Sequence, residues 1–158
     1  MSGSAAPAGP RRFIKPGTVV MCLRGRQAGK KAVILKTHES GIGGKKFPCA
    51  TVVGIQRPPR QVKRGMSQSV IKKKQKVGVF FKHVNYSHFM PTRYTFTNAM
   101  QMVNVSEVEE LLKKDVAKTE KKAKKREVGK AFQEHVLKSA GTTEKAAGAK
   151  WFLTKLKF

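Results

Sequence analysis

In the first two thirds of the chain, hydrophobic residues come in short runs separated by polar segments rich in Gly, Pro, Lys and Arg. In residues 19–23 (VVMCL) and 32–35 (AVIL), apolar side chains occupy odd and even positions alike, so both faces of an extended segment would be apolar. Such strands need cover on both sides, as in a small barrel. The pattern predicts strands over residues 19–23, 32–35, 47–55, 79–86 and 94–96.

Two residues are expected to disturb these strands. Gly54 lies inside the third run, where a glycine marks a bulge or a close backbone approach. Pro91 precedes the last run and is expected to form an extended turn before it.

The segment between the first two strands, residues 24–31, combines glycines with cations. Gly25 and Gly29 allow the positive φ values of a tight reversal. No acidic residue interrupts the cations, so a hairpin here would present a positive cluster at the rim of a rigid scaffold. A polyanion is the expected partner. The cations of this loop are Arg24, Arg26, Lys30 and Lys31.

A second basic region follows the third strand. Residues 57–65 (RPPRQVKRG) cannot form a central strand because Pro58 and Pro59 lack backbone donors. An extended, polyproline-like crossing is expected instead. A lysine-rich run, residues 72–76, comes soon after, and no acidic residue occurs between positions 40 and 105. Such a run is usually only a solvated surface. Here it follows another basic segment with no acid nearby in the sequence, which favours anion binding.

The last third of the chain has helical periodicity. Ser106 and Glu109 form a capping-box pattern that predicts a helix start at Ser106. Residues 118–126 contain Ala123 as their single apolar residue, so this part is expected to lie along a polyanion or to stay solvated. Apolar spacing resumes with Val128, Phe132 and Val136, and the apolar, basic terminus KWFLTKLKF suggests docking onto a larger body.

Charge narrows the class of partner. The chain of 158 residues holds 34 Lys and Arg against 9 Asp and Glu, a formal net charge of +25. Nucleic acid is the leading partner, and an acidic membrane surface is a distant second because no strongly amphipathic face is present. No apolar run approaches the ~18 residues of a membrane span. Motifs of hydrolases, metalloproteases and nucleotide-binding loops are missing, so neither a catalytic residue nor a metal ligand is predicted.

The first hairpin resembles the KOW motif of ribosomal proteins and transcription elongation factors. The resemblance rests on KPG before the first strand, on the loop from Gly25 to Lys31, and on the following AVILK. In that motif the hairpin belongs to an SH3-like β-barrel. The resemblance therefore implies a mostly β fold with α: an SH3-like (KOW) barrel, then a long basic C-terminal helical extension and an extended tail.

The likeness extends along the chain to one family. RRFIKPG, GRQAGKKAVILK, VGIQRPPRQV, VNYSHFMPTRYTF and KWFLTKLKF occur in this order between Arg11 and Phe158. Together they resemble the eukaryotic-type large-subunit ribosomal protein twenty-seven family, whose members are not enzymes. Residues 1–10, 98–104 and 141–150 depart from the family pattern. The division predicted from sequence is a disordered arm over 1–11, the barrel with basic loops over 12–100, and the helical extension and tail over 101–158.

The resemblance implies a structural constituent of the cytosolic large ribosomal subunit that binds and stabilises large-subunit ribosomal RNA and so supports translation. Its expected partners are that RNA and neighbouring large-subunit proteins, with no membrane, small-molecule substrate or homo-oligomer. No cofactor is expected, apart from Mg²⁺ held through RNA. The expected location is cytoplasmic, with nuclear or nucleolar passage during assembly. Two alternatives stay open: a KOW-bearing transcription factor that binds proteins, and a free RNA chaperone.

Candidate RNA contacts are of two kinds. Lys and Arg neutralise phosphates without reading sequence, whereas aromatic rings and His can stack on or hydrogen-bond to unpaired nucleotides. The predicted RNA-binding residues are Arg24, Arg26, Lys30, Lys31, Arg57, Arg60, Lys63, Arg64, Lys72, Lys73, Lys74, Lys76, His88, Arg93, Tyr94, Lys121, Lys125, Lys150, Trp151, Lys155 and Lys157. Stacking on bases or filling of the core are both open readings for Tyr94 and Trp151.

Overall fold

The structure, a computed structural model, describes residues 13–96, 98–113, 116–139, 151–154 and 156, with only the backbone for 135–139. The predicted arm over 1–11 lies outside the described residues. So do Lys150, Lys155 and Lys157, and the side chain of Val136.

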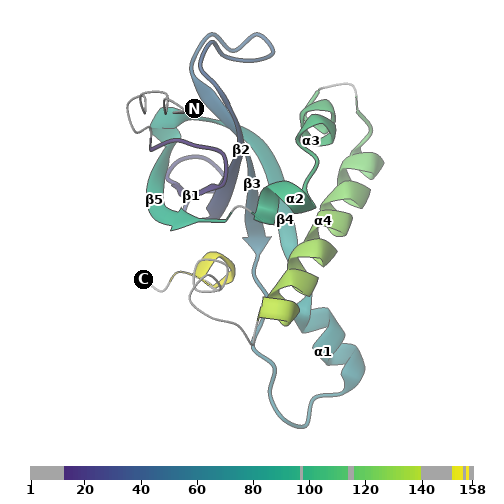
Figure 1. The fold of residues 1–158 in the computed structure, drawn as a ribbon. Helices are drawn as coiled ribbons and strands as arrows, with labels where there is room; N and C mark the ends of the chain where they lie inside the picture. Colours follow the sequence, from purple (N-terminus) through teal and green to yellow (C-terminus); the bar gives the residue numbers. More distant parts are fainter. Residues whose placement is uncertain (1–12, 97, 114–115, 140–150, 155, 157–158) are drawn as a thin grey trace, which may run out of the picture.

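A curled antiparallel sheet organises the chain (Figure 1). Its strand order is β4-β3-β2-β1-β5, and each neighbouring pair is antiparallel. The mixed β/α class expected from the sequence is therefore confirmed. The strands are β1 (Thr18–Cys22), β2 (Lys31–His38), β3 (Cys49–Arg57), β4 (Gly78–Asn85) and β5 (Phe89–Thr95), with a short 3-10 helix η1 (Tyr86–His88) before β5.

Two sequence predictions about this region need correction. The last strand was expected over 94–96 after a turn at Pro91, but β5 begins at Phe89 and Pro91 pairs with Val20 inside it. Because β5 is an edge strand, a residue without a backbone N–H is tolerated there. The lysine run, for which no helix was predicted, forms α1 (Gln68–Gln75), with no buried residue.

Both faces of the sheet are apolar, as the pattern predicted. Val19 and Val20 are neighbours in β1 and both are fully buried, one in each of two separate clusters. The inner cluster lies within the curl and contains Phe80, whose ring packs over Gly54 in the paired strand. A Cβ at Gly54 would lie 2.2 Å from the Phe80 ring, so the expected close approach at this glycine is confirmed.

Helices and a C-terminal turn cover the outer face (Figure 1). They are α2 (Asn98–Met102), α3 (Val105–Leu111), α4 (Lys118–Ser139) and the turn over residues 151–154. Phe96, Phe132 and Phe152 meet there with ring centroids 5.6–6.0 Å apart. Residues before and after position 100 thus share one hydrophobic cluster. The domain boundary predicted at this position concerns which part folds independently, and it stays a prediction.

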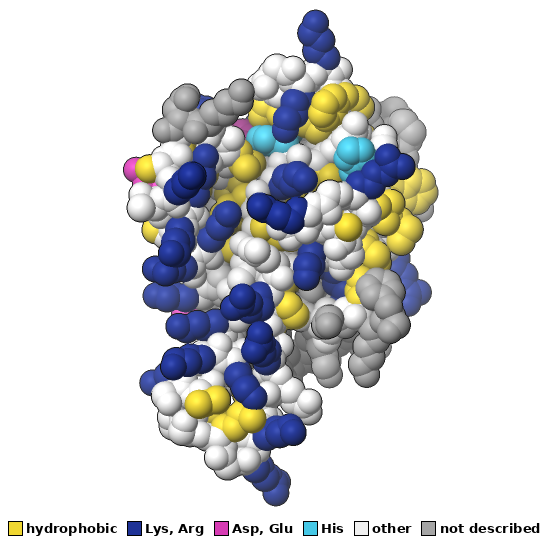
Figure 2. All heavy atoms as spheres, turned by 180° about the vertical axis from the view of Figure 1, so that it is seen from behind, with side chains coloured by type: hydrophobic (Ala, Val, Ile, Leu, Met, Phe, Trp, Pro, Cys, Tyr) yellow, Lys and Arg dark blue, Asp and Glu magenta, His cyan; other side chains and the backbone are white. Residues whose placement is uncertain are grey.

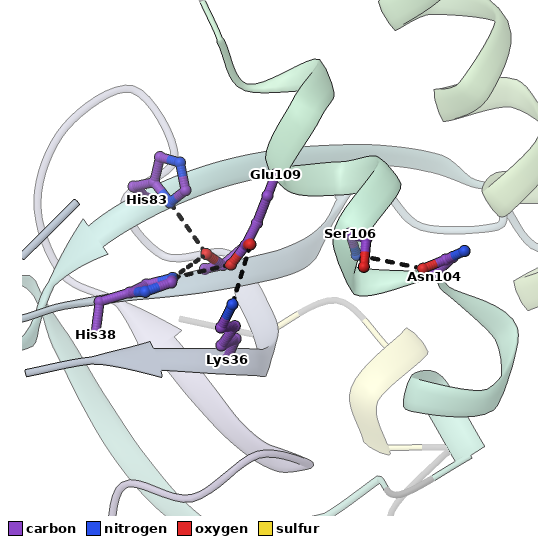
Figure 3. Close-up of polar contacts among 7 residues, drawn as sticks. Lys36, His38, His83, Asn104, Ser106 and Glu109 are labelled. Atoms are coloured by element: carbon purple, nitrogen blue, oxygen red, sulfur yellow. Dashed lines mark hydrogen bonds and ion pairs between the residues drawn. The ribbon is translucent and has the colours of Figure 1, made fainter. Parts of the chain in front are cut away.

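The start of α3 differs from the predicted capping box. Asn104, not Ser106, is the N-cap, because its Oδ1 accepts a hydrogen bond from the Ser106 backbone N–H at 3.2 Å (Figure 3). The Asn104 amide also donates to Glu107 at 3.1 Å. Glu109 therefore takes no part in capping, and its side chain points towards the sheet.

A polar cluster fastens α3 to the sheet at Glu109 (Figure 3). Lys36 Nζ lies 3.1 Å from Glu109 Oε2, and His38 Nε2 lies 3.2 Å from Oε1, which is buried and makes no hydrogen bond of good geometry among the described residues. Thr51 Oγ1 bridges the two histidines, at 2.9 Å from His38 Nε2 and 3.1 Å from His83 Nδ1. The Thr51 hydroxyl has a single proton and can donate it to only one of the two histidines. The other histidine must therefore donate its own N–H to the Thr51 oxygen.

The two halves of α4 behave differently. Its first half, the cationic part over 118–126, is largely exposed, and Lys124 is tied to Glu107 of α3 at 2.5 Å. Its second half packs through Val128, Gly129 and Phe132. This exposure is consistent with both alternatives predicted for 118–126, contact with a polyanion and solvation. The helix is anchored by the apolar residues that follow.

Phe132 offers a direct test of the outer core. We expect Phe132→Ala to lower the free energy of unfolding by about 3–5 kcal/mol, because the ring is fully buried against two other phenylalanines. Urea denaturation followed by circular dichroism measures this. Phe13→Ala is the matched control, since Phe13 is 83% exposed and its loss should change little. Equal effects would contradict the packing of α4.

His83 predicts a pH dependence. Burial lowers the pKa of His83, helped by Lys45 and His38 and opposed by Glu109. The unfolded chain therefore binds a proton more readily, so the contribution of His83 is complete above its unfolded pKa of about 6.5 and is lost as pH falls below it. We expect His83→Gln to unfold with a shallower loss of stability between about pH 7.5 and pH 5.5. An unchanged slope in urea melts would contradict this.

Candidate nucleic-acid interface

The loop between β1 and β2 is a rigid platform for cations. Gly25 and Gly29 have φ values of 83° and 71°, as the sequence predicted. The backbone closes the loop by bonds from Gly29 N to Cys22 O at 2.7 Å and from Cys22 N to Lys30 O at 2.9 Å. Arg24 and Arg26 are exposed on this loop.

Three segments distant in sequence converge beside this loop into one cleft of about 810 Å³, here called the hairpin cleft. The β1–β2 loop forms one wall, the proline crossing that follows β3 forms another, and the start of β4 closes the third. The cleft is lined by Arg26, Gln27, Lys30, Gln56, Arg57, Pro58, Pro59, Arg60, Gln61, Lys76, Val77 and Gly78.

The hairpin cleft is built to hold anions. Its lining residues include five cations, Arg26, Lys30, Arg57, Arg60 and Lys76, and no carboxylate. Cations that crowd a concave surface without counter-charges focus a positive potential in it. Gln side chains add neutral donors and acceptors that can bond phosphate or ribose oxygens. The arrangement can neutralise several phosphates at once, and it offers no nucleophile or acid–base pair.

Lys31 is the clearest correction among the predicted RNA contacts. It was placed with the exposed loop cations, but it is the first residue of β2 and is 4% exposed. Its ammonium donates to the carbonyl oxygens of Trp151 at 2.5 Å and Thr154 at 3.0 Å, and lies 3.9 Å from the Trp151 ring centroid. Burial lowers its pKa. Lys31 therefore holds the C-terminal turn against the hairpin, and its ammonium is occupied by the two carbonyl oxygens and the Trp151 ring.

The aromatic candidates stack on each other. The rings of Tyr94 and Trp151 are parallel within 26° at a centroid distance of 4.6 Å. Arg93, on β5, is exposed and its Nη2 lies 3.5 Å from the Tyr94 hydroxyl, a hydrogen bond that raises the pKa of Arg93. Neither Tyr94 nor Trp151 lines the hairpin cleft, and His88 is half-buried outside it. Their stacking on RNA bases stays a prediction.

The remaining predicted cations lie on other surfaces of the described chain. Lys63 and Arg64 are exposed between the proline crossing and α1, and Arg24 lies outside the cleft lining. Lys72, Lys73 and Lys74 are on α1, and Lys121 and Lys125 are on the cationic half of α4. The prediction from sequence missed the glutamines of the cleft. For Gln56 and Gln61, their interleaving with Arg in QRPPRQ was the available signal.

The described part of the chain offers neither a cluster of metal ligands nor a membrane-spanning helix. No group of three His, Cys, Asp or Glu residues there could hold a metal ion. Among the described helices, none is both long enough and apolar enough to cross a membrane.

Trp151, the one tryptophan of the sequence, reports on Lys31. Because burial lowers the pKa of Lys31, its ammonium should lose its proton below the ordinary lysine value of about 10.4. We expect the fluorescence of Trp151 to change with pH as Lys31 loses its proton. The free energy of unfolding should rise over the same pH range, because the unfolded chain holds this proton more tightly.

Two variants isolate this titration. Lys31→Met should abolish it, whereas Lys30→Met, one residue away and half-exposed, should retain it. A titration of Trp151 fluorescence that persists in Lys31→Met would contradict the assignment.

Comparison with known proteins places the chain in a family. The model of the Ribosomal L27e protein family matches residues 19–158. Proteins named large ribosomal subunit protein eL27 are similar over 93% of this chain: 37% identical in Caenorhabditis elegans, 37% in Tetrahymena thermophila and 39% in Candida albicans, with 98%, 99% and 98% of each relative covered. The likeness predicted from the sequence motifs is therefore confirmed, and the chain belongs to the Ribosomal L27e protein family, whose members are structural ribosomal proteins and not enzymes.

Proposed function

We propose that this protein is a structural constituent of the cytosolic large ribosomal subunit that binds and stabilises large-subunit ribosomal RNA. The hairpin cleft carries the proposal, because five cations from three distant segments converge there without a carboxylate. The net charge of +25 supports the same partner, since so basic a chain repels itself unless a polyanion is present. Membership of a ribosomal protein family supports the cellular setting.

The finer description of the fold belongs to this proposal. The curled sheet, with its small residues and Phe80 inside the curl, is consistent with an SH3-like KOW barrel. The helices after residue 100 are proposed to be the basic extension of that barrel, although they also complete its outer core.

The proposed partners are large-subunit ribosomal RNA and neighbouring large-subunit proteins. The chain is proposed to act without a cofactor of its own, with any Mg²⁺ held through RNA, and to bind neither a membrane nor a small-molecule substrate. It is not proposed to form a homo-oligomer. Passage through the nucleus or nucleolus during assembly belongs to the same hypothesis.

Salt dependence tests the phosphate contacts. If the five cations of the hairpin cleft each neutralise one phosphate, affinity for a large-subunit RNA fragment should fall about 100- to 500-fold between about 50 and 200 mM salt. Fluorescence anisotropy at several salt concentrations measures this. An affinity almost independent of salt would rule out the phosphate model.

Co-sedimentation tests the cellular assignment. The tagged protein should migrate with large subunits in stoichiometric amounts, and Arg57→Glu with Arg60→Glu should stay in the free fraction, because it places repulsive charges in the cleft. Circular dichroism controls for folding. A transcription-factor module or a free RNA chaperone would not co-sediment stoichiometrically, and that result would overturn the proposal.

A further inference from the structure

A second basic cleft adjoins the hairpin cleft. It lies between α1 and α4, has a volume of about 610 Å³, and is here called the helix cleft. Lys76 and Val77 line both clefts, so the two share a wall where the chain leaves α1 and enters β4. The helix cleft is lined by Lys72, Lys76, Val77, Arg126, Gly129, Lys130 and Gln133.

Backbone contacts fix the walls of both clefts. Gly129 lets α4 approach the strand entry, because a Cβ there would lie only 2.5 Å from the Val77 carbonyl oxygen. Arg126 and Lys130 lie one turn apart on α4 and flank this contact. On the other side, the Arg60 N–H donates to the Lys74 carbonyl at 2.9 Å, which ties the proline crossing to the last turn of α1.

The charges of the helix cleft are as uncompensated as those of the hairpin cleft. Lys72, Lys76, Arg126 and Lys130 are exposed, and no carboxylate lines the cleft. The acids nearest in sequence are Glu127, which pairs with Lys124, and Glu134, which is exposed on α4 and does not line the cleft. Figure 2 shows one face of the molecule with Lys and Arg side chains from the sheet down to the end that holds α1, and few acidic side chains among them.

The lining residues specify which part of a nucleic acid would enter. No aromatic side chain lines either cleft, so neither offers a stacking platform for bases. Lys and Arg with Gln amides suit phosphate and ribose oxygens. Cavities of this size elsewhere enclose molecules of a few hundred daltons, so a single strand can enter one, whereas the full width of a duplex cannot.

We propose that the two clefts form one continuous track for the sugar–phosphate backbone of an unpaired RNA segment, from the β1–β2 loop past Lys76 to Arg126 and Lys130. This inference rests on the proposed function and assigns RNA contact to Arg126 and Lys130, which are not among the RNA-binding residues predicted from the sequence. The track reads phosphates and not bases, so its affinity depends on salt and hardly on sequence.

The test compares two double variants of the full chain. Arg126→Gln with Lys130→Gln removes two charges from the track, and Lys45→Gln with Lys46→Gln removes two exposed charges from the β2–β3 loop, at the opposite end of the molecule from α1 (Figure 1). The probes are oligouridylate and oligoadenylate of equal length and a duplex of the two. Anisotropy titrations over a range of salt give the slope of log affinity against log salt.

The expected result is a slope shallower by about 1.4 for the track variant with both single strands, since each lost contact contributes about 0.7. The control variant should keep the wild-type slope. Equal losses in both variants, or an unchanged slope in the track variant, would overturn the track while leaving the proposed function standing. If loss of the Arg126 and Lys130 charges reduced the slope for the duplex as much as for the single strands, the single-strand assignment would be overturned. Salt-independent binding by the wild-type protein would instead refute the proposed function.

Discussion

Two-sided burial of the central strands is the constraint on which the rest of this structure depends. Neighbouring residues in β1, such as Val19 and Val20, are both fully buried, and side chains that alternate along a strand point to opposite faces. The sheet therefore has no face that can be left to water. Curling of the sheet encloses one cluster, and the other must be covered by chain from outside the sheet.

That requirement explains why so basic a C-terminal region packs on the sheet. Val128, Phe132 and Phe152 complete the outer cluster, and the cationic half of α4 is positioned by the apolar half that follows it. Lys31 adds a polar connection to the same region, since its ammonium is enclosed by the carbonyl oxygens of the C-terminal turn and the Trp151 ring. A buried ammonium without such partners would be strongly destabilising.

Among the described residues, the other cations stay at least partly exposed and have few carboxylates to pair with. The sheet and its covering helices hold cations from the β1–β2 loop, the proline crossing, α1 and α4 around two adjoining clefts. Rigid placement of these segments matters for binding, because ordering a flexible backbone at the moment of association would cost conformational entropy in addition to that of the side chains. The scaffold thus supports its proposed role through geometry as much as through net charge.

The sequence by itself determined the first four strands, their two apolar faces, the positive-φ glycines of the hairpin and the excess of cations, because these follow from side-chain type and local backbone preference. It also identified the family, through motifs that span most of the chain.

Only the tertiary structure decided the outcomes that depend on segments far apart. Lys30 lines a cleft while the next residue, Lys31, is buried, because β2 begins between them and the turn over 151–154 covers one side. Pro91 fits within β5 because that strand lies at the edge of the sheet. Arg26, Arg57 and Lys76 meet because the pairing of β2, β3 and β4 brings their segments to one end of the sheet. Local patterns specify faces and turns, whereas convergence of charges depends on packing between distant residues, which no local pattern contains.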